Sequence, residues 1–188
     1  TLALGVLAFA ERRPQQATAY LDEVDTAALP LDLAMSVRLV QAGLLATEKA
    51  DSALDLLREV QIGSRGTQLE SSARRQMVSL LIGRARIDEA LEALVAYYRR
   101  FPRSLFNDQY SQQLAAELAA ASTDRLPAKT SRLAEDLARI DPGIAVSFLT
   151  QLASHALFMG RVELAVAAGN ALSASAADKP EIALRGQL

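Results

Sequence analysis

The stretch Asp51–Gln61, DSALDLLREVQ, returns along the chain at nearly constant spacing. Related stretches are Gln15–Asp25 (QQATAYLDEVD), Asp88–Tyr98 (DEALEALVAYY) and Glu163–Ser173 (ELAVAAGNALS). Superposed, they align an alanine and, four residues on, a leucine or glycine: Ala17, Ala53, Ala90 and Ala165, then Leu21, Leu57, Leu94 and Gly169. The alanines are 36, 37 and 75 residues apart, and 75 is about twice 37. Such a period is typical of stacked helix-turn-helix repeats, which offer a long surface to a binding partner.

The composition favours a helical protein that binds proteins rather than polyanions. Of 188 residues, 51% are apolar and 22% are charged, an ordinary balance for a folded domain. Only six prolines and nine glycines are present to interrupt helices. The formal charge of −2 provides no positive field that would attract a polyanion, so we expect no nucleic-acid partner.

Apolar residues at helical spacing predict about ten helices in antiparallel pairs. We expect them at residues 2–12, 15–24, 32–47, 51–60, 68–82, 88–100, 105–121, 128–140, 144–159 and 162–174, with another beginning beyond Pro180. Thr67 precedes Glu70 by three residues, the spacing of a capping box. Asp141 and Pro142 read as the N-cap and first-turn proline of a helix. We therefore predict an all-α fold, a right-handed α-α superhelix (tetratricopeptide-like solenoid) of about five antiparallel helix pairs.

We expect residues 1–188 to form a single helical-repeat domain and to be a fragment of a longer chain. The chain begins at Thr1 and ends without a closing signal. The opening run 2–10, LALGVLAFA, resembles the apolar part of a signal peptide, but no basic stretch precedes it and it lies where the first repeat helix should be. No apolar run approaches the ~20 residues of a membrane span, so we expect no transmembrane segment.

The turns within the pairs resemble those of tetratricopeptide repeats. Gly160–Ala165 (GRVELA) has the small residue that closes a first helix and, five places on, the alanine that lets two helices approach closely. Ala85 and Ala90 keep this spacing, and the proline that ends a repeat follows Ala90 by twelve residues. At two other turns Arg12 and Glu48 take the place of the small residue. The resemblance therefore implies degenerate repeats.

A narrower resemblance begins at Tyr97–Ser104, YYRRFPRS, and continues through Leu105 and Phe106 into a Gln/Ala-rich helix. This stretch is similar to the MotC family of periplasmic flagellar motor proteins. The resemblance implies an exported, non-catalytic helical-repeat protein that works with the periplasmic domain of the stator protein MotB. Arg-Phe-Pro-x-Ser also closes repeats in tetratricopeptide-type envelope assembly proteins, and such a protein stays open as an alternative. So does the helical arm of a cell-wall lytic enzyme.

The residues that carry chemistry are sparse, and we expect no catalytic centre, cofactor or bound metal. The chain has no cysteine, which excludes disulfides, thiolate ligands and cysteine nucleophiles. His155, the only histidine, lies on a helical stripe with Phe148, Leu152 and Met159 and reads as a half-buried packing residue. Carboxylate pairs such as Glu89/Glu92 and Glu135/Asp136 have basic neighbours that explain them. No phosphate loop, nucleophile elbow or metal-ligand spacing is present.

One cluster combines guanidinium and aromatic side chains densely enough to suggest a protein-binding site. Its candidate binding residues are Tyr97, Tyr98, Arg99, Arg100 and Arg103, with Phe101 and Phe106 nearby. In one interpretation Phe101 and one tyrosine pack into the next repeat, and the arginines neutralise a helix C-terminus. In the other, the cluster is an interface hot spot, where Tyr and Arg are enriched. Both hold if one tyrosine faces outward while Phe101 faces inward. The predicted function is a periplasmic, non-catalytic scaffold that acts with MotB in motility.

Overall fold

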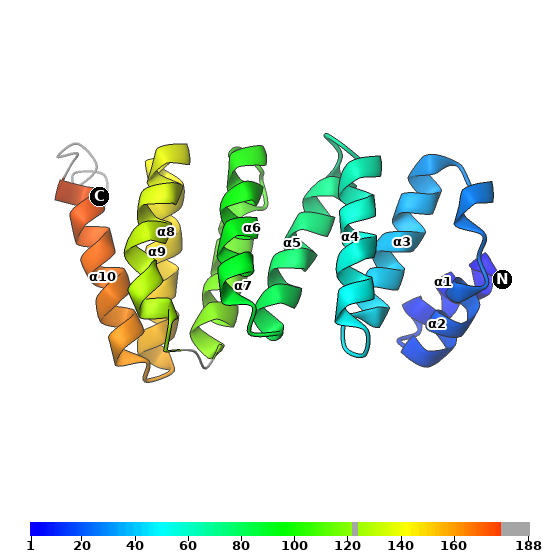
Figure 1. The fold of residues 1–188 in the computed structure, drawn as a ribbon, viewed down its shortest axis with the longest axis horizontal. Coiled ribbons are helices and arrows are strands. Elements are labelled where there is room, and N and C mark those ends of the chain that lie inside the picture. Colours follow the sequence, from blue (N-terminus) through cyan, green and yellow to red (C-terminus); the bar gives the residue numbers. More distant parts are fainter. Residues whose placement is uncertain (122–123, 178–188) are drawn as a thin grey trace. The chain divides into compact units, whose positions relative to one another are not determined.

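The computed structural model describes residues 1–121 and 124–177, with side chains up to residue 174. Over these residues the chain is all-helical and contains no strand, which confirms the all-α prediction (Figure 1). Its α-helices are α1 (Leu2–Ala10), α2 (Pro14–Asp22), α3 (Leu31–Leu45), α4 (Ala50–Gly63), α5 (Gln68–Gly83), α6 (Ile87–Arg100), α7 (Asn107–Ala120), α8 (Leu126–Ile140), α9 (Pro142–Phe158) and α10 (Val162–Ala177), with a short 3-10 helix, η1 (Thr26–Ala28), before α3. Each predicted boundary lies within three residues of the observed one. The helix expected beyond Pro180 lies outside the described residues.

The chain divides into two compact units, Thr1–Leu80 and Leu81–Leu188, with the boundary inside α5. In the first unit, α1 packs against α2 and α3 against α4. In the second unit, α9 packs against α10 and α7, while α8 contacts α6, α9 and α10. Helices α6, α7 and α8 alternate in direction, so that α6 and α8 run the same way (Figure 1).

The alanines that define the sequence repeat are buried, as their alignment predicts. The exposed fractions of Ala17, Ala53, Ala90 and Ala165 are 0%, 0%, 1% and 6%. Their backbone N–H groups make equivalent bonds, each donated to the carbonyl of the residue four places earlier: Arg13, Lys49, Arg86 and Arg161. The leucines one turn further on are buried as well. A small residue at this position lets the second helix of a pair lie close to its neighbours.

Three helix-ending turns share one backbone geometry. Arg12, Ala85 and Gly160 have φ values of 56°, 55° and 70°, in the left-handed region. In each turn this residue donates to a carbonyl three residues back, and the next residue donates to a carbonyl five residues back. This is the hydrogen-bond pattern of a Schellman motif. The turn at Glu48 differs, because Glu48 and Lys49 both donate to the carbonyl of Leu45.

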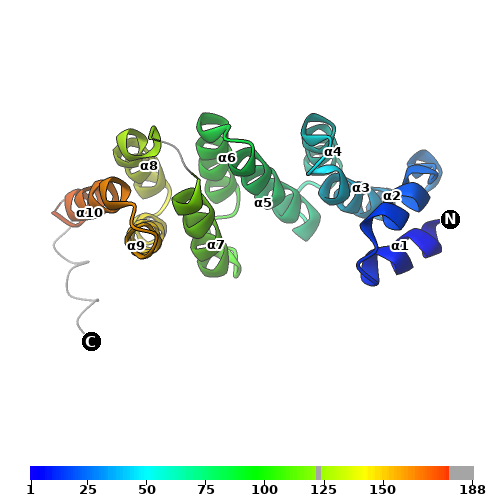
Figure 2. The same cartoon turned by 90° about the horizontal axis from the view of Figure 1, so that it is seen from below.

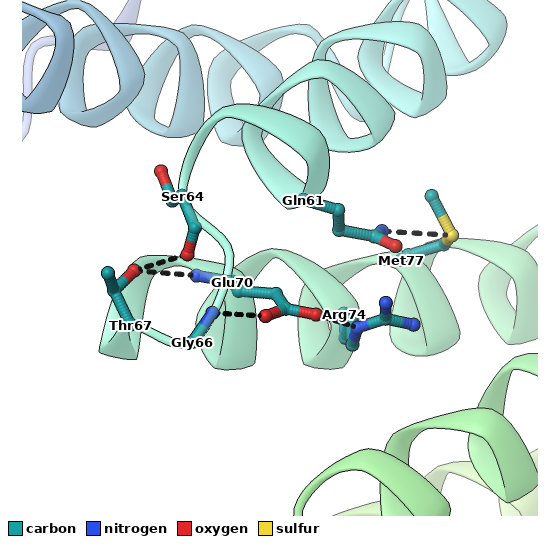
Figure 3. Close-up of polar contacts among 7 residues, drawn as sticks. All are labelled: Gln61, Ser64, Gly66, Thr67, Glu70, Arg74 and Met77. Atoms are coloured by element: carbon teal, nitrogen blue, oxygen red, sulfur yellow. Dashed lines mark hydrogen bonds and ion pairs between the residues drawn. The ribbon is translucent and has the colours of Figure 1, made fainter.

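The capping box predicted at the start of α5 is present in a shifted form (Figure 3). The Thr67 hydroxyl accepts a bond from the Glu70 N–H at 3.4 Å, while the Glu70 carboxylate accepts from the Gly66 N–H at 2.7 Å. Glu70 is buried and also accepts from Arg74 Nε at 2.9 Å, so its charge is compensated. At α9 the predicted cap is confirmed, because the Asp141 carboxylate accepts from the Gly143 N–H at 2.7 Å and Pro142 occupies the first turn.

Candidate protein-binding site

The structure buries both tyrosines of the predicted binding cluster. Tyr97 and Tyr98, in the last turn of α6, are 0% exposed, while Phe101 is half-buried. The expectation that one tyrosine faces outward is therefore wrong. The physical reason is that α7 folds back against the last turn of α6 and covers both rings.

The two rings form a buried aromatic cluster with Tyr110 of α7. The ring centroids of Tyr97 and Tyr110 lie 4.6 Å apart at 68°, and those of Tyr97 and Tyr98 lie 5.3 Å apart at 73°. Phe101 adds a tilted contact with Tyr97 at 5.7 Å. Edge-to-face geometry of this kind adds about 0.5–1.5 kcal/mol per pair beyond the burial of apolar area.

Two polar residues of α7 satisfy the buried tyrosine hydroxyls. Tyr97 donates to Asn107 Oδ1 at 3.1 Å, and the hydroxyls of Tyr98 and Ser111 share a hydrogen bond of 2.6 Å. Asn107 also donates to the carbonyls of Phe101 and Pro102, each at 3.0 Å. Burial raises the pKa of Tyr98 well above its ordinary value, because the charged form would lose its hydration.

Sequence reasoning missed these partners, although a signal for them exists. Asn107, Tyr110, Ser111 and Leu114 stand at helical spacing and are all buried. Two small polar residues on an apolar stripe, next to a pair of tyrosines, indicate buried hydroxyls that need partners.

The three arginines of the cluster are exposed and lie in different places. Arg99 lines an open groove between α6 and α8. The guanidinium of Arg100 lies 5.9 Å from the ring centroid of Phe101. Arg103 follows Pro102 in the turn to α7. The arginines of α6 stand in its last turn, as expected for cations at a helix C-terminus.

Most of the remaining candidates for chemistry take part in packing or in surface ion pairs. His155 is half-buried on α9, beside the fully buried Phe148 and Leu152. Glu89 accepts from Arg86 at 2.6 Å, and Asp136 accepts from Arg139 at 2.8 Å. In the part of the chain that the structure describes, no group of three or more His, Cys, Asp or Glu residues is placed to hold a metal ion.

The fold and this site define an all-α protein of packed helix pairs, with exposed arginines beside a buried aromatic junction. The family described as chemotaxis protein MotC matches residues 1–188, and the chain belongs to this family. Its role is therefore related to motility. No curated protein and no solved structure gives a significant match. Within residues 1–121 and 124–177, no helix has the length and apolar character needed to cross a membrane.

Proposed function

We propose that this chain is a non-catalytic protein-binding scaffold of the periplasm, an accessory of the flagellar motor stator that acts with MotB. The observation that carries the proposal is the MotC family match over the whole of residues 1–188. The family gives the motility role, and the helical repeats supply surfaces suited to a protein partner.

The architecture we propose is a right-handed α-α superhelix of about five antiparallel helix pairs in a single domain. Equivalent turns at Arg12, Ala85 and Gly160 support it, since they are 73 and 75 residues apart, close to two repeats each. The buried alanines support the same period. A repeated turn and a repeated close contact are the features from which a solenoid is built.

The two alternatives are the helical arm of a cell-wall lytic enzyme and a tetratricopeptide-type envelope assembly protein. Both would use the same kind of helical scaffold. The family match favours the motility role over them.

A titration tests the proposal. The chain is added to the isolated periplasmic domain of MotB, and the heat change or fluorescence anisotropy is recorded. We expect saturable binding, and no binding to an unrelated periplasmic peptidoglycan-binding domain used as a control. Absence of binding to MotB up to millimolar chain would contradict the stator role.

The exposed arginines at the end of α6 give a sharper form of this test. Because Arg100 and Arg103 are exposed, alanine substitution of both should mainly slow association and weaken its dependence on salt. Stopped-flow association rates at low and high salt measure both effects. Unchanged association rates and an unchanged salt dependence would exclude Arg100 and Arg103 from the interface. Tyr98→Phe serves as the matched control, since its buried ring makes no surface contact and the association rate should not change.

A further inference from the structure

The groove between α6 and α8 is an open channel in the second unit with a volume of about 680 Å³. Helices α6 and α8 form its two walls and lie side by side (Figure 2). They run in the same direction (Figure 1). The lining of the groove combines apolar residues of both helices, Leu91, Val95, Ala96 and Leu133, with charged ones.

Most of the charges along the groove are already paired. Lys129 forms an ion pair with Asp88 at the end where both helices begin. At the other end, Asp136 lies 3.8 Å from Arg132 and 2.8 Å from Arg139. These contacts neutralise the acidic and basic groups of α8 and one acid of α6.

Two charges in the groove, Glu92 and Arg99, make no ion pair or hydrogen bond with any residue that the structure describes, and both are exposed. They stand seven residues apart on α6, which is about 10 Å along the helix. Val95 and Ala96 lie between them and are half-buried. The groove therefore has one unpaired negative charge, an apolar middle and one unpaired positive charge, in that order along α6.

An amphipathic helix has the complementary pattern. Such a helix places apolar residues at i, i+3, i+4 and i+7 in a groove. Stable helices carry acidic residues in the first turn and basic residues in the last turn, because these charges oppose the helix dipole. A helix antiparallel to α6 and α8 would bring its acidic first turn to Arg99 and its basic last turn to Glu92.

We propose that the groove between α6 and α8 binds an amphipathic helix of a partner protein, with its acidic first turn on Arg99 and its basic last turn on Glu92. This proposal rests on the proposed scaffold function, because it assumes a protein ligand. It is independent of whether that ligand is MotB.

The test uses three designed peptides of three helical turns, labelled with a fluorophore, and fluorescence anisotropy with the whole chain. The first peptide has Glu in the first turn, Leu and Ala on one face, and Lys in the last turn. The second is the same but acidic at both ends. The third has the charges of the first and a central proline that prevents a helix. Because none of them is MotB, a failure here is distinguishable from a failure of the stator proposal.

The chain should bind the first peptide at least tenfold more tightly than the second or the third. The Glu92→Arg variant replaces the acidic end of the groove by a basic one, so its preference should change to the second peptide. Glu163→Arg is the matched control, because it reverses an exposed acidic charge in the first turn of α10, outside the groove, and it should leave the preference unchanged. Circular dichroism checks that each variant is folded.

Four outcomes would overturn the proposal. They are no saturable binding of the first peptide at millimolar concentration, the same preference in the chain and its Glu92→Arg variant, equal binding of the proline peptide, and loss of preference in Glu163→Arg. Sedimentation that shows a dimer dissociated by Glu92→Arg would assign the groove to a second copy of the chain instead.

Discussion

Asn107 joins the end of α6 to the start of α7 through both ends of its side-chain amide. Its oxygen accepts from the Tyr97 hydroxyl, and its nitrogen donates to the carbonyls of Phe101 and Pro102. The three bonds satisfy a buried hydroxyl and two carbonyls at the end of α6, where intrahelical partners run out. One residue therefore fixes both the turn and the orientation of a buried ring.

Removal of the Asn107 side chain should lower the unfolding free energy substantially. Asn107→Ala leaves the Tyr97 hydroxyl and two carbonyls without their partner, and we expect a loss of about 2–3 kcal/mol of unfolding free energy. Tyr97→Phe removes only the hydroxyl and should cost about 1 kcal/mol. Urea unfolding of the two variants measures the difference. A smaller loss in Asn107→Ala than in Tyr97→Phe would contradict this account.

Tyr98 makes stability dependent on alkaline pH. Because burial raises its pKa in the folded state, its contribution is fully present below the unfolded value of about 10. As pH rises above about 10, the unfolded state loses the proton first and unfolding is favoured. The urea midpoint should therefore fall between pH 9 and pH 11, and it should fall less in Tyr98→Phe. An equal fall in both proteins would show that Tyr98 does not cause it.

At the scale of the elements, three turns between paired helices depend on one residue in the left-handed region. Gly160 adopts this conformation without strain, but a Cβ there is unfavourable. Arg12 and Ala85 adopt it although they carry side chains. The surrounding Schellman bonds must offset the cost at these two turns.

Two glycine substitutions should change the stability of the chain in opposite directions. Gly160→Ala should destabilise the chain by about 1 kcal/mol, because its φ is +70° and no neighbouring atom lies close enough to add a clash. Gly169→Ala, inside α10 and equally free of close neighbours, should stabilise it by about 0.5–1 kcal/mol. Thermal melting of both variants is the measurement. A rise in melting temperature for Gly160→Ala would contradict the role given to this turn.

The elements were largely predictable from sequence, because their signals are local. Apolar spacing located the helices, and Asp141, Pro142 and Thr67 marked where helices begin. The unusual turns were less predictable, since neither Arg12 nor Ala85 is a residue that ordinarily favours positive φ. The conformation of each turn depends on how the helix after it packs, α2 after Arg12 and α6 after Ala85.

The candidate site was predicted only in part, for the same reason. The dense run of Tyr and Arg is visible in the sequence, but burial of Tyr97 and Tyr98 depends on α7 folding back over them. The groove that contains Arg99 needs α8, which begins 27 residues after Arg99. The polar and apolar stripe of α7 indicates that buried hydroxyls need partners, but the sequence between Arg99 and α8 gives no signal that these two elements meet.

At the scale of the whole molecule, the chain divides into two compact units within α5. Our expectation of a single domain stays a prediction that calorimetry can test. If the chain unfolds as one cooperative domain, the calorimetric and van't Hoff enthalpies should be equal. A calorimetric enthalpy about twice the van't Hoff value would contradict a single domain and indicate that the units unfold separately.

The buried aromatic cluster also determines which part of the protein contributes to its tyrosine optical signals. The chain has no tryptophan and four tyrosines, and three of these, Tyr97, Tyr98 and Tyr110, are the chromophores packed between α6 and α7. The fourth, Tyr20, is 36% exposed on α2. The tyrosine bands of near-ultraviolet dichroism should therefore come mainly from one place in the second unit, whereas far-ultraviolet dichroism comes from every helix. The three buried tyrosines are thus an intrinsic probe of the packing between α6 and α7, and no added label is needed.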